Sequence, residues 1–193
     1  MDIKETTGTW DYATLPSNVH LGAGCYLENK ASFSRFRSTR DPGLVLGNAV
    51  QVYQWSAFSV EPDAMVTVGE ESTLVGVVFW CAESITVGKR VIISYNVMIA
   101  DCDFHPRDPD LRRQDAVAIT PQGDLSQRPP LYTKPVVIDD DVSVGIGAII
   151  LKGVHIGAGA RISAGAVVTS NVPAGSVVAG NPARIVEQED NTL

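Results

Sequence analysis

One histidine, His105, stands in a sequence context that suits proton transfer. Its neighbours include Asp101, Asp103 and Pro106. Imidazole suits the role of a general base because its unperturbed pKa lies near neutral pH. A nearby carboxylate can orient the ring and stabilise the imidazolium. His105 is therefore a candidate base, although a single histidine in a loop is, taken alone, more often structural or idle than catalytic. The candidate supporting or ligand-binding carboxylates are Asp101, Asp103 and Glu83.

The other reactive side chains lie in less suitable contexts. His20 precedes the first repeat, and His155 lies between two residues expected to point inward, so both are expected at the surface. Cys102 invites a nucleophilic role, but no cation that would stabilise a thiolate stands beside it. The cysteines, Cys25, Cys81 and Cys102, are few and odd in number, which makes a disulfide framework unlikely.

A six-residue period organises the chain from Ile138 onward. A first row is aliphatic: Ile138, Val144, Ile150, Ile156, Ile162 and Val168. A second row, four residues later in each unit, is also apolar: Val142, Ala148, Val154, Ala160, Ala166 and Val172. Each second-row residue lies two positions before the next first-row residue, and this spacing puts both on one face of a strand.

A third row supplies the corners between these strands. Its members are Asp141, Gly147, Gly153, Gly159, Gly165 and Asn171, types that tolerate positive φ. If three strands make one turn of a coil, residues eighteen apart stack, as in Ile138 on Ile156. The pattern therefore predicts an all-β fold, a parallel β-helix with the shape of a triangular prism. An ordinary β-sandwich is the alternative.

The repeat is less regular in the first half of the chain. It is clear at Val87, Ile93 and Ile99, and slips by one or two residues occur near Val68 and Leu74. Such slips indicate bulges or short loops at corners, where side chains can be aimed outward. We expect one domain over residues 21–186, preceded by an extension at 1–20 and followed by a tail at 187–193.

The repeat is absent from Phe104 to about Lys134. A segment of this length without regular structure is uncommon in a compact domain unless it is functional or disordered. Because it begins at His105, we expect a loop of about residues 104–135 that projects from the prism and lines a ligand pocket. Its candidate contacts with a polar or anionic ligand are Arg107, Arg112, Arg113 and Tyr132; a solvated insertion is the alternative.

The composition excludes several classes of partner. A formal charge of −7 argues against binding to nucleic acid or anionic membranes. No apolar run has the length of a membrane span, and the opening residues lack the apolar stretch of a secretory signal. We expect a cytoplasmic protein.

Two segments resemble the hexapeptide-repeat acyltransferases. Residues 142–186, with AGAVVTSNVP followed by VVAGNPARIV, are similar to the closing half of these proteins. Residues 85–106, ending in ADCDFHP, look like the active-site stretch of their sugar O-acetyltransferase branch. The resemblance implies a left-handed coil, a homotrimer with sites at subunit interfaces, and transfer of an acetyl group from acetyl-CoA to a sugar hydroxyl by His105, with no metal. Direct transfer of this kind needs no covalent intermediate on Cys102.

The resemblance also implies a binding site for coenzyme A. Its contacts would be Gly145, Ile146, Ala164, Thr169, Ser170 and Arg184. The sequence departs from many relatives at Ser143, Ser170 and Glu187, where they carry Trp, Lys and a basic residue. Phosphate binding is therefore expected to rely on Arg184, Arg161 or Lys152.

Three other functions remain open at this point. Relatives that N-acylate amino sugars make an amine acceptor the first alternative. A non-catalytic scaffold would explain the coil but not the motif around His105. β-Helical carbonic anhydrases bind zinc through three histidines, but His20, His105 and His155 are too scattered for such a site.

Overall fold

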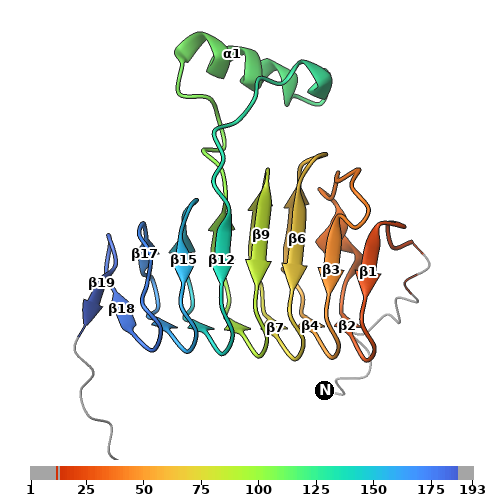
Figure 1. The fold of residues 1–193 in the computed structure, drawn as a ribbon. Coiled ribbons are helices and arrows are strands. Elements are labelled where there is room, and N and C mark those ends of the chain that lie inside the picture. Colours follow the sequence, from red (N-terminus) through yellow and green to blue (C-terminus); the bar gives the residue numbers. More distant parts are fainter. Residues whose placement is uncertain (1–11, 13, 187–193) are drawn as a thin grey trace, which may run out of the picture.

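The chain coils into a three-sided prism of short, mainly parallel strands (Figure 1). The computed structural model describes residue 12 and residues 14–186. Sheet A contains β1 (Val19–Leu21), β3 (Leu44–Leu46), β6 (Met65–Val68), β9 (Ser84–Val87), β12 (Val136–Ile138) and β15 (His155–Ile156). Sheet B contains β2 (Tyr26–Leu27), β4 (Gln51–Val52), β7 (Thr73–Leu74), β10 (Ile92–Ile93), β13 (Ser143–Val144), β16 (Arg161–Ile162), β18 (Val177–Ala179) and β19 (Arg184–Val186). Sheet C contains β5 (Ala57–Val60), β8 (Val78–Cys81), β11 (Met98–Ala100), β14 (Ile149–Ile150) and β17 (Val167–Val168).

The predicted stacking of residues eighteen apart is confirmed. Ile138 pairs with Ile156, Val144 with Ile162, and Ile150 with Val168. Every member of the first and second rows is at most 5% exposed. These side chains form one column of aliphatic groups inside the prism, and the predicted left-handed parallel β-helix is confirmed.

The corners use the left-handed backbone conformation at five of the six predicted positions, from Asp141 at φ 62° to Gly165 at φ 68°. Asn171 is the exception, and this prediction was wrong. Its side-chain oxygen instead accepts a hydrogen bond from the backbone N–H of His155 at 2.9 Å. Gly175 takes the left-handed conformation at the next corner.

The first half of the coil has longer turns than the second. Leu44 pairs with Val66, and Val78 pairs with Met98, offsets of 22 and 20 residues. Larger side chains fill these wider turns: the rings of Phe58 and Phe79 stack with centroids 5.1 Å apart. The slips read from the sequence therefore correspond to longer turns that hold aromatic side chains.

The coil ends differently from the sequence-based expectation that it continues to residue 186. Strand β19 pairs antiparallel with β18, and Ala179 lies opposite Arg184. The chain therefore reverses after the last parallel turn, so that β19 covers the free edge of sheet B. Unpaired edges of parallel sheets otherwise offer a template for association with other strands.

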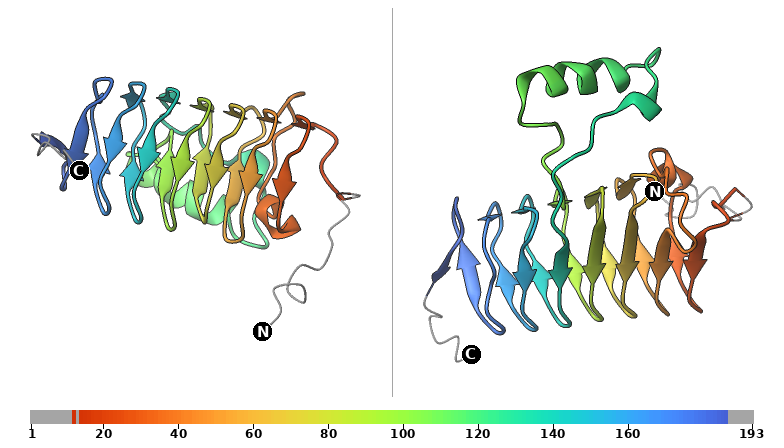
Figure 2. Two further views of the ribbon diagram at one scale, coloured as in Figure 1. Left: turned by 90° about the horizontal axis from the view of Figure 1, so that it is seen from below. Right: turned by 45° about the horizontal axis from the view of Figure 1, so that its top comes forward.

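The long segment between β11 and β12 leaves the prism, as predicted, and projects from the middle of its length (Figures 1 and 2). Its stem is closed by an antiparallel bridge between Cys102 and Thr133. The expectation that it lacks regular structure was wrong. It contains the helix α1 (Pro109–Ala118) and the 3-10 helix η3 (Leu125–Gln127). We call residues 103–132 the excursion.

Helix α1 begins with a recognisable start signal in the sequence. The Asp108 side chain accepts hydrogen bonds from the backbone N–H groups of Asp110 and Leu111, and Pro109 occupies the first turn. Proline suits this place because its fixed φ is helical and the missing N–H has no partner there in any case.

We expect Ile85→Ala to destabilise the coil strongly and its strand neighbour Thr86→Ala to change stability little. Ile85 is fully buried in β9, whereas Thr86 is exposed. Replacing a buried isoleucine by alanine removes apolar contacts and leaves a cavity, at a cost of about 2–5 kcal/mol. Urea denaturation followed by circular dichroism measures both changes. Equal effects of the two substitutions would contradict the burial described here.

Candidate active site

The predicted base, His105, is held by a carboxylate of the excursion. Its Nδ1 lies 2.5 Å from Oδ2 of Asp115. A carboxylate accepts hydrogen bonds, so Nδ1 carries the proton and Nε2 is the basic nitrogen. The His105 side chain is 48% exposed and borders a pocket, which leaves Nε2 accessible to a ligand. This is the arrangement of a base whose tautomer is fixed by a carboxylate.

Asp115 is a fully buried carboxylate with two cationic or polar partners. Besides His105, it accepts a hydrogen bond from Nε of Arg128 at 2.6 Å. Burial by itself would raise the pKa of the Asp115 carboxyl, but the hydrogen bonds from His105 and Arg128 outweigh it, and the pKa lies below its ordinary value. Asp115 is therefore charged at neutral pH and stabilises a protonated His105.

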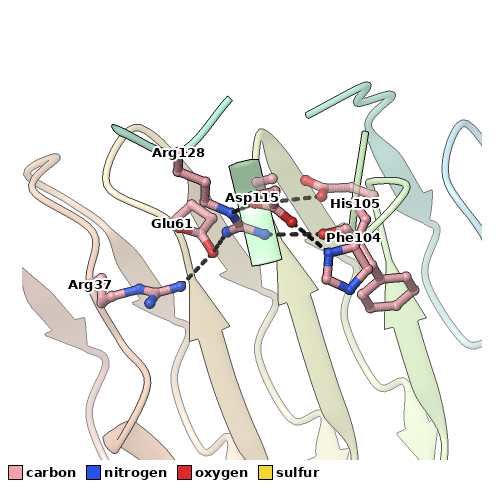
Figure 3. A network of polar contacts seen from close by, with 8 residues as sticks. Arg37, Glu61, Phe104, His105, Asp115 and Arg128 are labelled. Atoms are coloured by element: carbon pink, nitrogen blue, oxygen red, sulfur yellow. Dashed lines mark hydrogen bonds and ion pairs between the residues drawn. The ribbon is translucent and has the colours of Figure 1, made fainter. Parts of the chain in front are cut away.

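Arg128 connects the excursion to the coil (Figure 3). One of its nitrogens lies 2.7 Å from Oε1 of Glu61, just beyond β5, and another donates to the backbone carbonyl of Phe104. Glu61 in turn accepts from Arg37 at 2.5 Å. The side chains alternate in charge from Arg37 to His105, so the coil fixes the position of the His105 imidazole through this chain of ion pairs.

A pocket of about 510 Å³ lies between the outer face of sheet C and the excursion. Its wall on the coil comes from the N-terminal turns, and its cover from the excursion. The lining residues include Arg35, Arg37, Glu61, Trp80, Phe104, His105, Ile119, Arg128 and Leu131. The volume falls within the range of about 300–1,000 Å³ found for small-molecule sites.

The two cysteines beside this pocket are not activated nucleophiles. Burial raises the pKa of Cys102 to about 11, so its thiol stays protonated at neutral pH. Burial also raises the pKa of Cys81, whose Sγ donates to Asp101. Nucleophilic catalysis requires the thiolate, and neither residue provides it.

The carboxylates proposed from the sequence have other partners than the His105 ring. Asp101 is fully buried and accepts from the backbone N–H groups of Ala82 and Glu83 at 2.7 and 2.8 Å. Burial raises its pKa despite these bonds. Glu83 itself is exposed. The pairing of Ala100 with Trp80 puts Asp101 level with Cys81, two residues from the expected stacking on Glu83.

Asp103 lies on the other side of the excursion stem from the pocket. It forms ion pairs with Lys152 and with Nε of Arg107. Burial would raise its pKa, but the two cations lower it below the ordinary value. Arg107 lies over the ring of Tyr132, 5.0 Å from the centroid, and Lys152 lies 5.4 Å from it.

The structure places Arg112 and Arg113 away from the pocket, although the sequence predicted that both contact a ligand. Arg112 donates to the backbone carbonyls of Pro106 and Arg107, at 3.4 and 3.1 Å. Arg113 pairs with Asp110 at 3.8 Å on the exposed side of α1. Neither lines the pocket beside His105.

The residues proposed to bind coenzyme A fall into two groups. Gly145 and Ile146 precede β14 and adjoin Ala164, where a Cβ on Gly145 would meet the Ala164 nitrogen at 2.6 Å. Thr169 and Ser170 directly follow β17, so they lie at the opposite end of the sheet C strands.

Two of the basic residues expected to bind phosphate, Lys152 and Arg184, lie near the strand β17 that precedes Thr169 and Ser170. Lys152 follows β14 and stands level with Ser170, because β14 and β17 pair at an offset of eighteen. Arg184 follows Ala183, whose N–H donates to the carbonyl of Val167 in β17. Arg161 lies exposed in sheet B.

The remaining histidines are at the surface, as predicted. His20 lies 2.7 Å from Asp41, and His155 lies 2.9 Å from Asp139, with half or more of each imidazole exposed. Among the described residues no cluster of three or more His, Cys, Asp or Glu side chains has the geometry of a metal site. Within the same part of the chain no helix is long and apolar enough to cross a membrane.

Sequence reasoning missed the orienting carboxylate and the arginine that holds it. Asp115 lies ten residues from His105, and Arg128 lies 67 residues from its partner Glu61. The Asp108-Pro109 start signal of α1 would have predicted the helix that carries Asp115. No local signal pairs Arg128 with Glu61.

The sequence of the regular part matches a known repeat. Residues 135–170 match the family model described as bacterial transferase hexapeptide (six repeats). A 2,3,4,5-tetrahydropyridine-2,6-dicarboxylate N-acetyltransferase of Staphylococcus aureus is 54% identical over 59 residues, which are 31% of this chain and 25% of the relative. The chain thus matches about a quarter of the length of this relative.

Solved structures extend the likeness to most of the coil. A hexapeptide-repeat acetyltransferase of Vibrio cholerae, in complex with acetyl-CoA, is 27% identical with a TM-score of 0.59, over 77% of this chain and 72% of the other. A mutant of AntD, an N-acyltransferase of Bacillus cereus in complex with dTDP and coenzyme A, shares the fold with a TM-score of 0.65 and 19% identity, over 87% and 82% of the two chains. The chain therefore carries the bacterial transferase hexapeptide repeat over residues 135–170 and is similar in fold to hexapeptide-repeat acetyltransferases.

We expect protonation of the Asp115 carboxylate at low pH to release α1 from the coil. Its folded-state pKa is depressed, so its stabilising effect is complete above the ordinary carboxyl pKa and is lost as pH falls through 3.8 to the lower folded value. Hydrogen exchange of residues 109–118, corrected for intrinsic rates, should show lost protection in this window. Asp115→Asn should lower protection already at pH 7, by about 3 kcal/mol.

Asp110→Asn is the control for this experiment. Asp110 lies in the same helix, but its side chain is 92% exposed and contacts Arg113 loosely. Wild-type protection of α1 in Asp115→Asn would show that the buried carboxylate does not hold the helix in place.

Proposed function

We propose that the protein transfers an acetyl group from acetyl-CoA to a hydroxyl of a sugar, with His105 as general base. The observation that carries the proposal is the His105–Asp115 pair, whose basic nitrogen borders a pocket of suitable size. The V. cholerae acetyltransferase in complex with acetyl-CoA supports the choice of donor.

The pair can perform each proton transfer of this reaction. Nε2 of His105 removes the proton of the acceptor hydroxyl as its oxygen attacks the thioester carbonyl carbon. The carbon–sulfur bond then breaks, an ester forms, and the leaving sulfur takes the proton from the imidazolium. Asp115 stabilises the imidazolium between the two transfers, because it remains ionised in its buried position.

Coenzyme A is proposed to bind on the C-terminal side of His105, opposite the arginine-lined pocket. Thr169, Ser170 and Lys152 lie there at one corner of the prism, next to the excursion stem. Lys152 and Arg184 supply positive charge for phosphate groups. With the acetyl donor on this side, the pocket on the N-terminal side is left for the acceptor.

The proposed assembly is a homotrimer with one active site at each interface. The two groups of proposed coenzyme A contacts lie at opposite ends of the sheet C strands: Gly145, Ile146 and Ala164 at one end, Thr169 and Ser170 at the other. One extended ligand would contact both groups more easily if each group came from a different one of two neighbouring chains. A row of exposed apolar side chains runs along the first of these corners: Trp55 and Ile146 are 69% and 50% exposed. Contact with another copy would bury this row.

Acetylation of an amine on an amino sugar is the second candidate. It is supported by the S. aureus relative, which is named as an N-acetyltransferase. The same base would take a proton from an ammonium or from the attacking amine. Treatment of the product with hydroxylamine distinguishes the two functions, because it cleaves an ester and leaves an amide intact.

We expect His105→Ala to lower kcat by about 10²–10⁴-fold because the general base is lost. Thiol release from acetyl-CoA, followed across a panel of sugars and amino sugars, measures the effect. His155→Ala is the matched control, since His155 is exposed and pairs with Asp139 away from the pocket. Undiminished turnover in His105→Ala would exclude the base. Failure of the wild type to bind acetyl-CoA would favour a scaffold.

For Arg184→Gln we expect the KM for acetyl-CoA to rise about tenfold, equivalent to ~1.4 kcal/mol, with kcat little changed. Arg184 is exposed beside β17, and its role would be to bind a phosphate. Arg113→Gln also removes one positive charge and should leave this KM unchanged, because Arg113 lies on α1. The same KM in both variants would exclude the phosphate contact.

A further inference from the structure

The wall of the pocket opposite the excursion presents two arginines side by side. Residues 35–37 run next to β5, because Phe36 bridges to Val60. Phe36 packs against the core, so the side chains of Arg35 and Arg37, one position to either side, point outward. Both line the pocket that His105 borders.

The adjacent turns continue these two positions as rows across sheet C. Val60 pairs with Cys81, which puts Trp80 in the row of Arg35 and Ala82 in the row of Arg37. The Arg35 guanidinium lies over the Trp80 ring, 5.8 Å from its centroid. The register of the coil therefore fixes the positions of Arg35 and Trp80 next to each other in this wall of the pocket.

The charges around the pocket do not cancel. Glu61 pairs with both Arg37 and Arg128, and Asp115 pairs with Arg128. Arg35 has no carboxylate partner among the ion pairs of the described residues. Three guanidinium groups thus face two carboxylates, in a chain whose formal charge is −7. The excess positive charge is concentrated where the pocket wall meets solvent.

Two hydrogen-bond donors in the same wall lack acceptors. Arg37 Nε and Trp80 Nε1 are buried and have no hydrogen-bond partner in the described part of the chain. A buried donor without an acceptor costs about 1–3 kcal/mol. Neighbouring atoms cover both donors, so the hydrogen bonds to a ligand would come from the more exposed guanidinium of Arg35 and from the end of the Arg37 guanidinium.

We infer that the acceptor is an acidic saccharide, whose carboxylate or phosphate is bound by Arg35 and Arg37 while a hydroxyl reaches His105. This inference rests on the proposed function and specifies its acceptor. A planar guanidinium can donate two parallel hydrogen bonds to a carboxylate or phosphate, which fixes orientation as well as charge. Trp80 offers an apolar face on which a sugar ring can pack.

The phosphates of coenzyme A are a second possible ligand for these arginines. The positions proposed for coenzyme A, Lys152 and Thr169, lie on the other side of the excursion stem. A substitution in the acceptor site should therefore change the KM for the sugar and leave the KM for acetyl-CoA alone.

The test compares acceptors that differ in their acidic group. Glucuronate and glucose 6-phosphate are each compared with glucose, and N-acetylneuraminate with N-acetylmannosamine, by thiol release from acetyl-CoA. We expect at least one acidic member to have a kcat/KM about tenfold or more above its neutral partner, falling as ionic strength rises. The carboxylate and phosphate arms show which group is preferred.

Arg35→Gln is the informative variant, because Arg35 is exposed and its loss disturbs no ion pair. It should lower kcat/KM for the acidic acceptor about tenfold and leave the neutral acceptor and the KM for acetyl-CoA unchanged. Arg40→Gln is the control: it removes the same charge from the same segment, but Arg40 is outside the pocket.

Three outcomes would overturn the inference: equal turnover of acidic and neutral acceptors, an equal loss on both in Arg35→Gln, or a raised KM for acetyl-CoA. Calorimetric titrations separate this failure from that of the proposed function. Acetyl-CoA binding without binding of any acidic sugar overturns the inference alone. Binding of an acidic sugar that requires Arg35, without binding of acetyl-CoA, supports the anion site and overturns the transferase.

Discussion

The stacking of each turn on the one before it is the constraint on which the rest of the structure depends. Most strands of the second half have two residues, too few to be stable alone. They persist because each pairs with a strand eighteen residues away, and β13, β14 and β16 also pair with a second strand on the other side. The inward rows must be aliphatic and in register, since a shift by one residue would turn them to solvent. A rigid prism results, on which outward side chains have fixed positions.

The excursion is stabilised differently, by charge. A fully buried carboxylate, Asp115, accepts from both His105 and Arg128, and Arg128 reaches Glu61 on the coil. Such a buried pair contributes little net stability but is costly to break, because one charge would remain without a partner. This asymmetry favours one position of the excursion over many others. The same contacts that hold it over the prism also orient the imidazole.

His105 therefore stands between two different surfaces. On the N-terminal side, the wider early turns present Arg35, Arg37 and Trp80 around a partly open pocket. On the C-terminal side, the regular turns present small residues and Lys152 along open corners. The division follows from the repeat itself: irregular turns carry large side chains that shape a pocket, and regular turns carry small residues that leave their corners open.

The sequence by itself determined the coil, its inward rows, most of its corners and the place where it breaks, because a strict period repeats the same local residue pattern many times. It also singled out His105 as the candidate base, five residues after the last strand before the break. Only the tertiary structure revealed Asp115, Arg128 and the Arg35–Arg37 wall as parts of one site. Their partners lie in other turns or at the far end of the excursion, at separations that no local pattern encodes. Long-range contacts of this kind depend on the register of the coil and on where a non-repetitive segment folds back, and both are set by packing and charge in three dimensions.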